Sequence, residues 1–198
     1  MKWNAFIIQL EKSSLNLFLN MDTGELFLQS VINRFNDYKK LGERTFEQLS
    51  EEEMHLQPNE TSNSIAIIIQ HLNGNMLSRW TNFLTEDGEK TWRQRDEEFE
   101  IHSLSKEQLL ALWNEGWKVL LQTLSTLKPG DLNKTVTIRN EPHSVIDAIN
   151  RQVAHYSSHI GQIVLLGKWM KAEQWQTLSI PKKGSTAFNK KMMGKNYK

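Results

Sequence analysis

Four long stretches of the chain place apolar residues three and four positions apart, which is the period of an α-helix. They cover residues 24–49, 64–84, 106–127 and 145–171. Each stretch is long enough for at least about five helical turns. The pattern predicts an all-α protein in which four apolar helix faces pack around one core.

Residues that favour a helix start precede each of these stretches. Ser105 followed by Gln108, and Ser144 followed by Asp147, have the spacing of a capping box, in which each side chain accepts a hydrogen bond from the other residue's backbone N–H. The candidate N-caps are Asp22 or Thr23, Ser62 or Ser64, Ser105 and Ser144.

The connections between the predicted helices differ in length. About twenty residues, 85–104, separate the second helix from the third, which is more than most loops contain. A connection of this length can return the chain to the end at which the second helix began, so that the second and third helices run parallel. Residues 135–140 (TVTIRN) are typical of a short strand, one half of a small hairpin between the third and fourth helices.

The composition excludes several kinds of site. The 198-residue chain contains no Cys, which excludes disulfides, cysteine-ligated zinc, iron–sulfur clusters and a cysteine nucleophile. Its net charge of +1 gives no overall attraction to nucleic acid. No apolar run reaches the roughly 18 residues that span a membrane. Glu11 and Lys12 interrupt the N-terminal stretch that superficially resembles a signal peptide. We expect a cytoplasmic protein that binds no membrane and no specific nucleic acid.

We divide the chain into three parts. Residues 1–20 form an N-terminal extension that we expect to be dispensable, because Met21 and Asp22 read like a natural start followed by a helix cap. Residues 21–180 form the helical bundle. Residues 181–198 form a basic C-terminal tail, with six Lys and no acidic residue from position 182 onward. We interpret these lysines as a solvated chain end, because no groove-reading motif accompanies them.

His155 and His159 lie four residues apart in the last helical stretch. This spacing stacks two imidazoles on one helix face, where both reach a single metal ion. Gln162 lies on the same line, about one turn further on. The pair alone has low specificity, because two solvated or hydrogen-bonded histidines share the pattern.

His71, in the second helical stretch, completes a candidate ligand set. On a helical wheel the His155–His159 pair lies about 100° from the apolar stripe of its helix, and His71 lies about 120° from its own stripe. If the two helices pack antiparallel, these flanks line a crevice beside the core. Three histidines would leave open positions for water and substrate, as in catalytic metal sites. Imidazole accepts Zn, Ni, Fe and Mn, so the identity of the one divalent ion stays open.

Four further polar residues lie near the histidines along the helices and are candidates to contact the ligands or a substrate. Arg79 and Arg93 border the long connection and have two interpretations. They either bind an anionic substrate near the metal, or belong to an ion-paired loop, since residues 86–100 include seven acidic side chains. No catalytic residue is assigned. The four contact candidates are Asn75, Arg79, Arg151 and Gln162.

Three stretches carry a family resemblance: residues 64–99 (SIAIIIQHLNGNMLSRWTNFLTEDGEKTWRQRDEEF), 138–169 (IRNEPHSVIDAINRQVAHYSSHIGQIVLLGKW) and 178–189 (LSIPKKGSTAFN). They resemble the DinB/YfiT-like superfamily of metal-binding four-helix bundles, and more closely an uncharacterised branch, a domain of unknown function, found in Bacillus-type bacteria. The resemblance implies an up-down-down-up four-helix bundle and a divalent metal held by three histidines. The ligand in the second helix of the family corresponds to His71, and its H-x-x-x-H pair corresponds to His155 and His159.

The resemblance also suggests a reaction class. Characterised members of the wider superfamily are thiol-dependent, namely transferases that use bacillithiol or glutathione and a mycothiol-dependent maleylpyruvate isomerase. This branch has no established reaction, and a fold does not fix one. We predict a metal-dependent enzyme that transfers a low-molecular-weight thiol to an electrophilic small molecule, in a homodimer. The alternatives are metal-dependent hydrolysis and a non-catalytic metal-binding role in a stress response.

Overall fold

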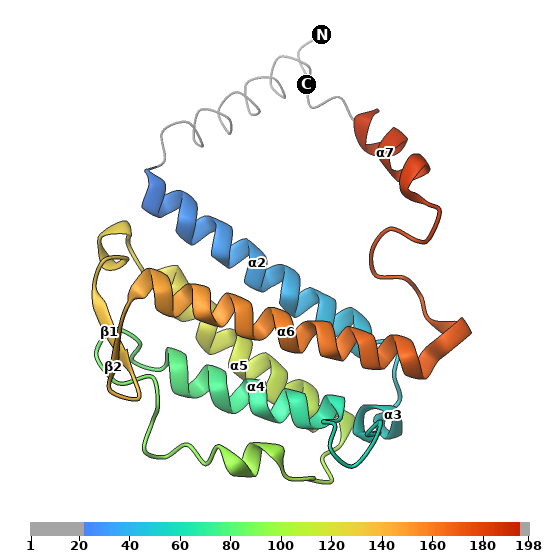
Figure 1. Cartoon of the computed structure of the whole chain (residues 1–198), viewed down its shortest axis with the longest axis horizontal. Helices are drawn as coiled ribbons and strands as arrows, with labels where there is room; N and C mark the ends of the chain where they lie inside the picture. The colour runs from blue at the N-terminus through green and yellow to red at the C-terminus, as the bar shows by residue number, and fades with distance from the viewer. Residues whose placement is uncertain (1–21, 195–198) are drawn as a thin grey trace.

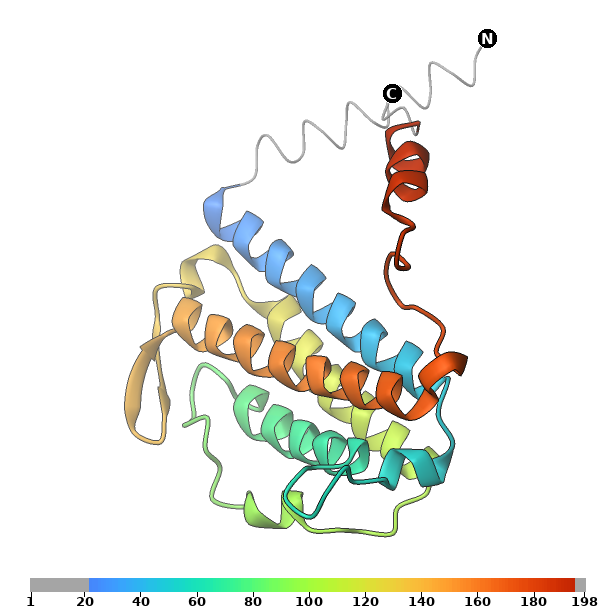
Figure 2. The same ribbon diagram turned by 45° about the vertical axis from the view of Figure 1, so that its right-hand side comes forward.

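The computed structural model describes residues 22–194, and most of them are helical (Figure 1, Figure 2). The predicted N-terminal extension lies outside the described residues. No helix within residues 22–194 is long and apolar enough to cross a membrane. The α-helices are α2 (Thr23–Phe46), α3 (Glu51–His55), α4 (Ile65–Trp80), α5 (Lys106–Thr126), α6 (Val145–Lys171) and α7 (Ser185–Met193). An antiparallel hairpin of β1 (Thr135–Ile138) and β2 (Glu141–Ser144) precedes α6, so the predicted hairpin is confirmed.

The predicted helix starts are formed by side-chain caps. The capping residues are Asp22, Ser64, Ser105 and Ser144. Ser105 and Gln108 complete the predicted capping box. At Ser144 only half of the box forms, because the carboxylate of Asp147 accepts a hydrogen bond from His143 Nδ1 instead (2.6 Å). The prediction of a full second box is therefore wrong.

Two short helices, α3 and α7, have no counterpart in the helical periodicity. α3 has five residues and α7 has nine, and α7 lies inside the segment predicted as a basic tail. α3 buries only Met54, and α7 buries no residue. Helices that bury so little need no apolar stripe, so the pattern that identifies long helices cannot identify them.

The four long helices meet at one aromatic centre. α2 packs against α6, and α4 packs against α5 (Figure 1). Phe35 of α2 lies 6.2 Å from Trp80 of α4, 6.3 Å from Trp117 of α5 and 5.8 Å from Tyr156 of α6, measured between ring centroids. All four rings are fully buried. Large rings in contact bury much apolar surface, which fixes how the helices pack.

A hydrogen-bonded triplet extends this centre toward the polar side of the molecule. The hydroxyl of Tyr156 accepts a hydrogen bond from Trp80 Nε1 (3.0 Å) and donates one to Asn75 Oδ1 (2.9 Å). Burial raises the pKa of Tyr156, so the phenol stays protonated and acts as the donor. Because Tyr156 follows His155 in α6, these bonds also fix the rotation of the helix that carries the histidine pair.

The long connection between α4 and α5, residues 81–104, returns along α4. Near the end of α4, Ser78 Oγ donates to Gly88 O (2.8 Å) and accepts from Lys90 N (3.1 Å). Near its beginning, Gln70 Nε2 donates to Glu100 O (3.0 Å). The connection therefore covers the face of α4 that the other helices leave open. Fourteen of the sixteen residues of α4 are buried as a result.

Asp87 fastens this connection to the hairpin. Its carboxylate accepts hydrogen bonds from the backbone N–H groups of Glu89 (2.7 Å), Arg139 (2.8 Å) and Asn140 (2.8 Å). Burial would raise the pKa of Asp87, but these backbone donors lower it below its usual range. Arg139 and Asn140 have φ values of 56° and 63°, as expected for the two central residues of a type I′ hairpin turn. The turn thus holds Arg139 beside the connection.

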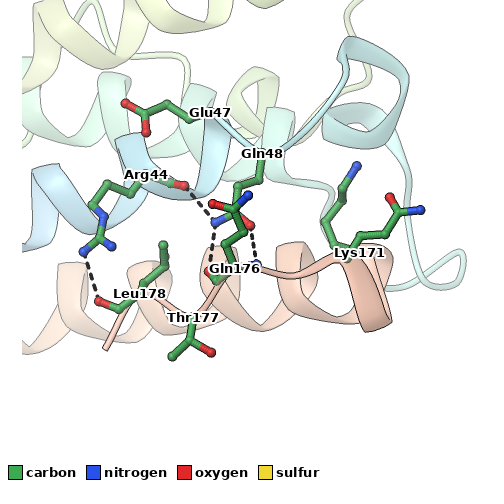
Figure 3. Close-up of a pocket in the computed structure, with 8 residues that line it drawn as sticks. Arg44, Glu47, Gln48, Lys171, Gln176, Thr177 and Leu178 are labelled. Atoms are coloured by element: carbon green, nitrogen blue, oxygen red, sulfur yellow. Dashed lines mark hydrogen bonds between the residues drawn. The ribbon is translucent and has the colours of Figure 1, made fainter. Parts of the chain in front are cut away.

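Beyond α6 the chain folds back over the end of α2 (Figure 3). Gln48 Nε2 donates to Gln176 O (3.2 Å), Gln48 Oε1 accepts from Gln176 N (2.8 Å), and Arg44 Nη1 donates to Leu178 O (3.0 Å). A hollow of about 440 Å³ lies among these residues. Since its amide, guanidinium and backbone groups bond one another, we interpret this region as an anchor for the C-terminal segment.

The packing of α2 on α5 depends on a glycine. A Cβ atom at Gly42 would lie 2.5 Å from Trp113 Cζ2. Gly42→Ala must therefore displace a buried indole, and we expect the free energy of unfolding to fall by about 1–3 kcal/mol in a denaturant titration.

Gly161→Ala is the matched control for this test. Gly161 lies on the exposed side of α6, and apart from its chain neighbours and the adjacent backbone of α6, no atom of the described chain comes within 4 Å of its Cβ position. Alanine there should leave the free energy of unfolding unchanged or raise it by up to about 1 kcal/mol. Equal effects of the two substitutions would contradict the close contact of α2 with α5.

Candidate metal centre

The structure brings the three predicted histidines together. His71 of α4 meets His155 and His159 of α6, and the three candidate ligand nitrogens lie within 4.8 Å of one another. His155 Nε2 is 3.3 Å from His71 Nε2 and 3.1 Å from His159 Nε2. Three imidazole nitrogens on a tetrahedral zinc ion, each about 2.1 Å from it, would lie about 3.4 Å apart. The observed spacing therefore fits a single ion.

Hydrogen bonds on the outer side of two rings determine which nitrogens face inward. Glu98 Oε2 lies 2.9 Å from His71 Nδ1, and Gln162 Oε1 lies 3.0 Å from His159 Nδ1. Both acceptors require a proton on Nδ1, which leaves each Nε2 with a lone pair. The two lone pairs point toward His155 Nε2. One proton on that nitrogen could satisfy only one of them, whereas a metal ion accepts all three nitrogens. The residues present therefore fit a divalent ion.

Glu98 is the residue of this site that the sequence did not reveal. It lies in the 3-10 helix η1 (Asp96–Phe99), and its side chain is 9% exposed. Its two oxygens accept hydrogen bonds from Arg93 Nε (2.7 Å) and Nη2 (2.9 Å), and one of them also accepts from His71. Nothing in the spacing of the acidic run 86–100 distinguishes Glu98 from its neighbours.

Glu98 remains a carboxylate. Burial would raise its pKa, but the hydrogen bond with His71 and the ion pair with Arg93 lower the pKa below its ordinary value. A carboxylate that accepts the second N–H of a ligating histidine fixes the ring and makes its other nitrogen a better ligand. The Arg93–Glu98 pair is therefore part of the site. The interpretation of Arg93 as a member of an ion-paired loop is confirmed.

The close approach of Glu98 to α4 requires a glycine. Gly74 lies about one helical turn after His71 in α4. A Cβ atom at this position would collide with Glu98 Oε1. On the same side, the ring of Phe99 covers His71, with centroids 4.7 Å apart and an angle of 31° between the planes. His71 is thus held by a carboxylate at its edge and an aromatic ring on its face.

The environment keeps the histidine pair uncharged. Burial lowers the pKa of His155 from 6.5 to about 3, and the nearby His159, His71 and arginines contribute to the same direction. The pKa of His159 is also lowered, chiefly by burial and then by His71. Metal binding requires neutral imidazole, so both rings are ready to bind at neutral pH without losing a proton.

A cavity of about 340 Å³ opens beside the three histidines. Its walls come from α4, the long connection, the hairpin turn and α6. Among the predicted contact residues, Asn75, Arg79 and Arg151 line it, whereas Gln162 lies outside the lining and bonds His159. No Asp or Glu is found among the described residues of the lining. Its arginines are Arg79, Arg93, Arg95, Arg139 and Arg151.

The other three histidines have structural partners elsewhere. His55 Nε2 bonds Leu104 O (2.8 Å), and His143 bonds Asp147. His102 lies 3.3 Å from Glu97 O. None of the three belongs to the triad.

These features define a mainly helical protein with a three-histidine candidate metal centre beside an arginine-lined cavity. The family described as "Protein of unknown function (DUF1572)" matches residues 22–184, and the chain belongs to this family. The match includes the three histidines, Glu98 and the arginines of the cavity. No curated protein matches the chain.

The contact between Glu98 and His71 leads to a test of metal affinity. Glu98→Gln keeps a hydrogen-bond acceptor for His71 Nδ1. It removes the negative charge that balances Arg93 and makes His71 Nε2 a better metal ligand. We expect metal affinity, measured by competition with a chelator, to fall by about tenfold to a hundredfold. Glu97→Gln, at the exposed neighbouring position, is the control and should leave the affinity unchanged. Equal affinities in the two variants would show that Glu98 does not support the site.

The depressed pKa of His155 predicts how stability depends on pH in protein stripped of metal. The unfolded state takes up the proton first, so the stability contributed by neutral His155 is fully present above pH 6.5 and is lost as the pH falls toward about 3. His155→Asn cannot titrate. As the pH falls from 6.5 toward about 3, the thermal midpoint of the wild type should therefore decrease more than that of His155→Asn. A pH-independent difference would contradict the depressed pKa.

Proposed function

We propose that this protein holds one divalent metal ion on His71, His155 and His159 and is a metal-dependent enzyme of the thiol S-transferase kind. The observation that carries the proposal is the convergence of three Nε2 atoms, two of them with lone pairs set by Glu98 and Gln162. Three protein ligands leave a position for a further molecule, which is typical of catalytic sites.

We also propose that the four long helices form an up-down-down-up bundle of the DinB/YfiT-like kind. The return of residues 81–104 along α4 supports this topology, because it lets α4 and α5 start at the same end. The course of α2 and α6 in Figure 1 and Figure 2, which run side by side, supports it further. The assignment to thiol transfer rests on analogy with the characterised, thiol-dependent members of that superfamily.

The residues of the site have separate tasks in such a reaction. A bound divalent ion would lower the pKa of a thiol or a water molecule and so supply a nucleophile near neutral pH. Glu98 and Gln162 keep the Nδ1 protons of His71 and His159 in place. The chain has no Cys, so the thiol must be brought by a small-molecule cosubstrate. The cavity beside the histidines gives that cosubstrate and an electrophile a place to bind.

The lining of the cavity favours thiol transfer over hydrolysis. Hydrolysis by a metal-bound water usually employs a nearby carboxylate as a general base. The described lining includes no Asp or Glu, and the buried Glu98 is already engaged with His71 and Arg93. A thiol needs less help, because coordination by a divalent ion is enough to deprotonate it.

Metal content is the first test of the proposed function. Purified wild-type protein should contain close to one divalent ion per chain by elemental analysis. His155→Ala and His159→Ala should lose it, because two ligands seldom retain such an ion. His143→Ala, which alters a histidine outside the triad, is the control. Equal metal in all four proteins would refute the site.

The thiol reaction can be tested in cobalt-substituted protein. Addition of bacillithiol or cysteine should produce a sulfur-to-cobalt charge-transfer band, because thiolates are good ligands for such ions. The chain has no sulfhydryl of its own to produce this band. Absence of the band at millimolar thiol, in protein that does contain cobalt, would reject thiol transfer and leave hydrolysis or a non-catalytic metal role.

A further inference from the structure

We propose that the cavity beside the three histidines binds an oxyanion group, a carboxylate or phosphate, of a small-molecule substrate through Arg79, Arg139 and Arg151. The role of this group in turnover rests on the proposed function. The binding itself depends only on the arginines and can be measured without metal.

The first argument is the local charge. Five guanidinium groups line the cavity, and among residues 22–194 two carboxylates, those of Glu89 and Glu98, contact them. A single oxygen of Glu89, Oε2, forms ion pairs with Arg79 (3.5 Å), Arg93 (3.4 Å) and Arg139 (3.2 Å). The whole chain carries a net charge of only +1, so the positive charge of the cavity is local and not a property of the chain as a whole. It favours an anionic ligand before any metal is bound.

The second argument is the state of Arg79. Its side chain is 7% exposed, and its ion pair with Glu89 is long (3.5 Å). Its Nε and Nη1 are buried and have no hydrogen-bond partner among residues 22–194. A buried guanidinium with two unsatisfied nitrogens is costly unless a ligand accepts hydrogen bonds from them. Carboxylate and phosphate groups are good acceptors for these hydrogen bonds, because the positions of their oxygens match the planar fork of arginine.

A further unsatisfied group on the same wall points to the rest of the ligand. Gln152 is buried in α6 and lines the cavity, and its Oε1 has no partner within the described part of the chain. A hydroxyl or amine on the ligand would supply the missing donor. The expected ligand is therefore a small polar molecule that combines an oxyanion with a hydrogen-bond donor.

The positions of the other two arginines place the oxyanion close to the metal centre. Arg151 lies one turn before His155 on α6, and Arg139 is held beside the long connection by the type I′ turn that Asp87 binds. Both side chains line the same cavity as His71 and His155. An oxyanion bound between them would leave the remainder of the substrate directed at the histidines.

The test is a calorimetric titration of the full chain with succinate, inorganic phosphate and the uncharged succinamide. Each ligand is titrated into metal-loaded protein and into protein treated with a chelator. At least one of the two oxyanions should bind both forms, and succinamide should bind at least tenfold more weakly. The tighter of succinate and phosphate identifies the oxyanion.

Arginine variants locate the site. Arg139→Gln and Arg151→Gln alter exposed side chains, so both should fold, and each should weaken oxyanion binding by about tenfold. Arg79→Gln should have a larger effect if circular dichroism shows that it folds. Arg34→Gln, on the exposed side of α2, makes the same charge change away from the cavity and should have no effect.

Three results would overturn the proposal: unchanged binding in both Arg139→Gln and Arg151→Gln, equal binding of succinamide, or loss of all binding when the metal is removed. The last would mean that the metal alone holds the anion. A wrong assignment of the metal site can be distinguished from a wrong assignment of the oxyanion site. Protein that contains no metal as purified, but binds succinate through the arginines, would reject the proposed function and retain the oxyanion site.

Discussion

The buried contact between Glu98 and His71 is the interaction on which the site depends. Glu98 belongs to the long connection, and His71 belongs to the helix that this connection covers. Their contact needs the missing side chain at Gly74 and the countercharge of Arg93. It sets the protonated nitrogen of His71 and at the same time fixes the connection against α4. The orientation of the metal ligand and the position of the connection therefore both depend on one buried contact between Glu98 and His71.

The aromatic centre supplies the other half of the site. Phe35, Trp80, Trp117 and Tyr156 join the four long helices. The hydroxyl of Tyr156, bonded to Trp80 and Asn75, then links this apolar centre to the wall of the cavity. Since His155 precedes Tyr156, packing in the core determines where the histidine pair points. Apolar packing brings the ligands together, and hydrogen bonds set their protonation.

Much of this arrangement could be predicted from the sequence, because long helices leave a clear period. The predicted fourth helix, 145–171, agrees with α6 at both ends. The second was predicted to reach Leu84 but ends at Trp80, because the chain leaves the helix to begin its return along α4 and Asn82 has a positive φ. The prediction that His71, His155 and His159 lie together, made from their helical positions and the family resemblance, is confirmed.

What the sequence could not predict arises from contacts between distant segments. An apolar stripe describes α4 poorly, because the connection buries its outer face as well. Glu98 is one acidic residue among several, and its importance comes from the approach of η1 to α4. The charge of the cavity similarly comes from arginines on four separate elements, which no local pattern unites.

X-ray absorption at the metal edge tests the central claim most directly. Protein loaded with one equivalent of zinc should show three nitrogen ligands at about 2.0–2.1 Å, with the multiple-scattering pattern of imidazole rings. A coordination shell made only of carboxylate or water oxygens, or of a single imidazole, would contradict the assignment of His71, His155 and His159 as the metal centre.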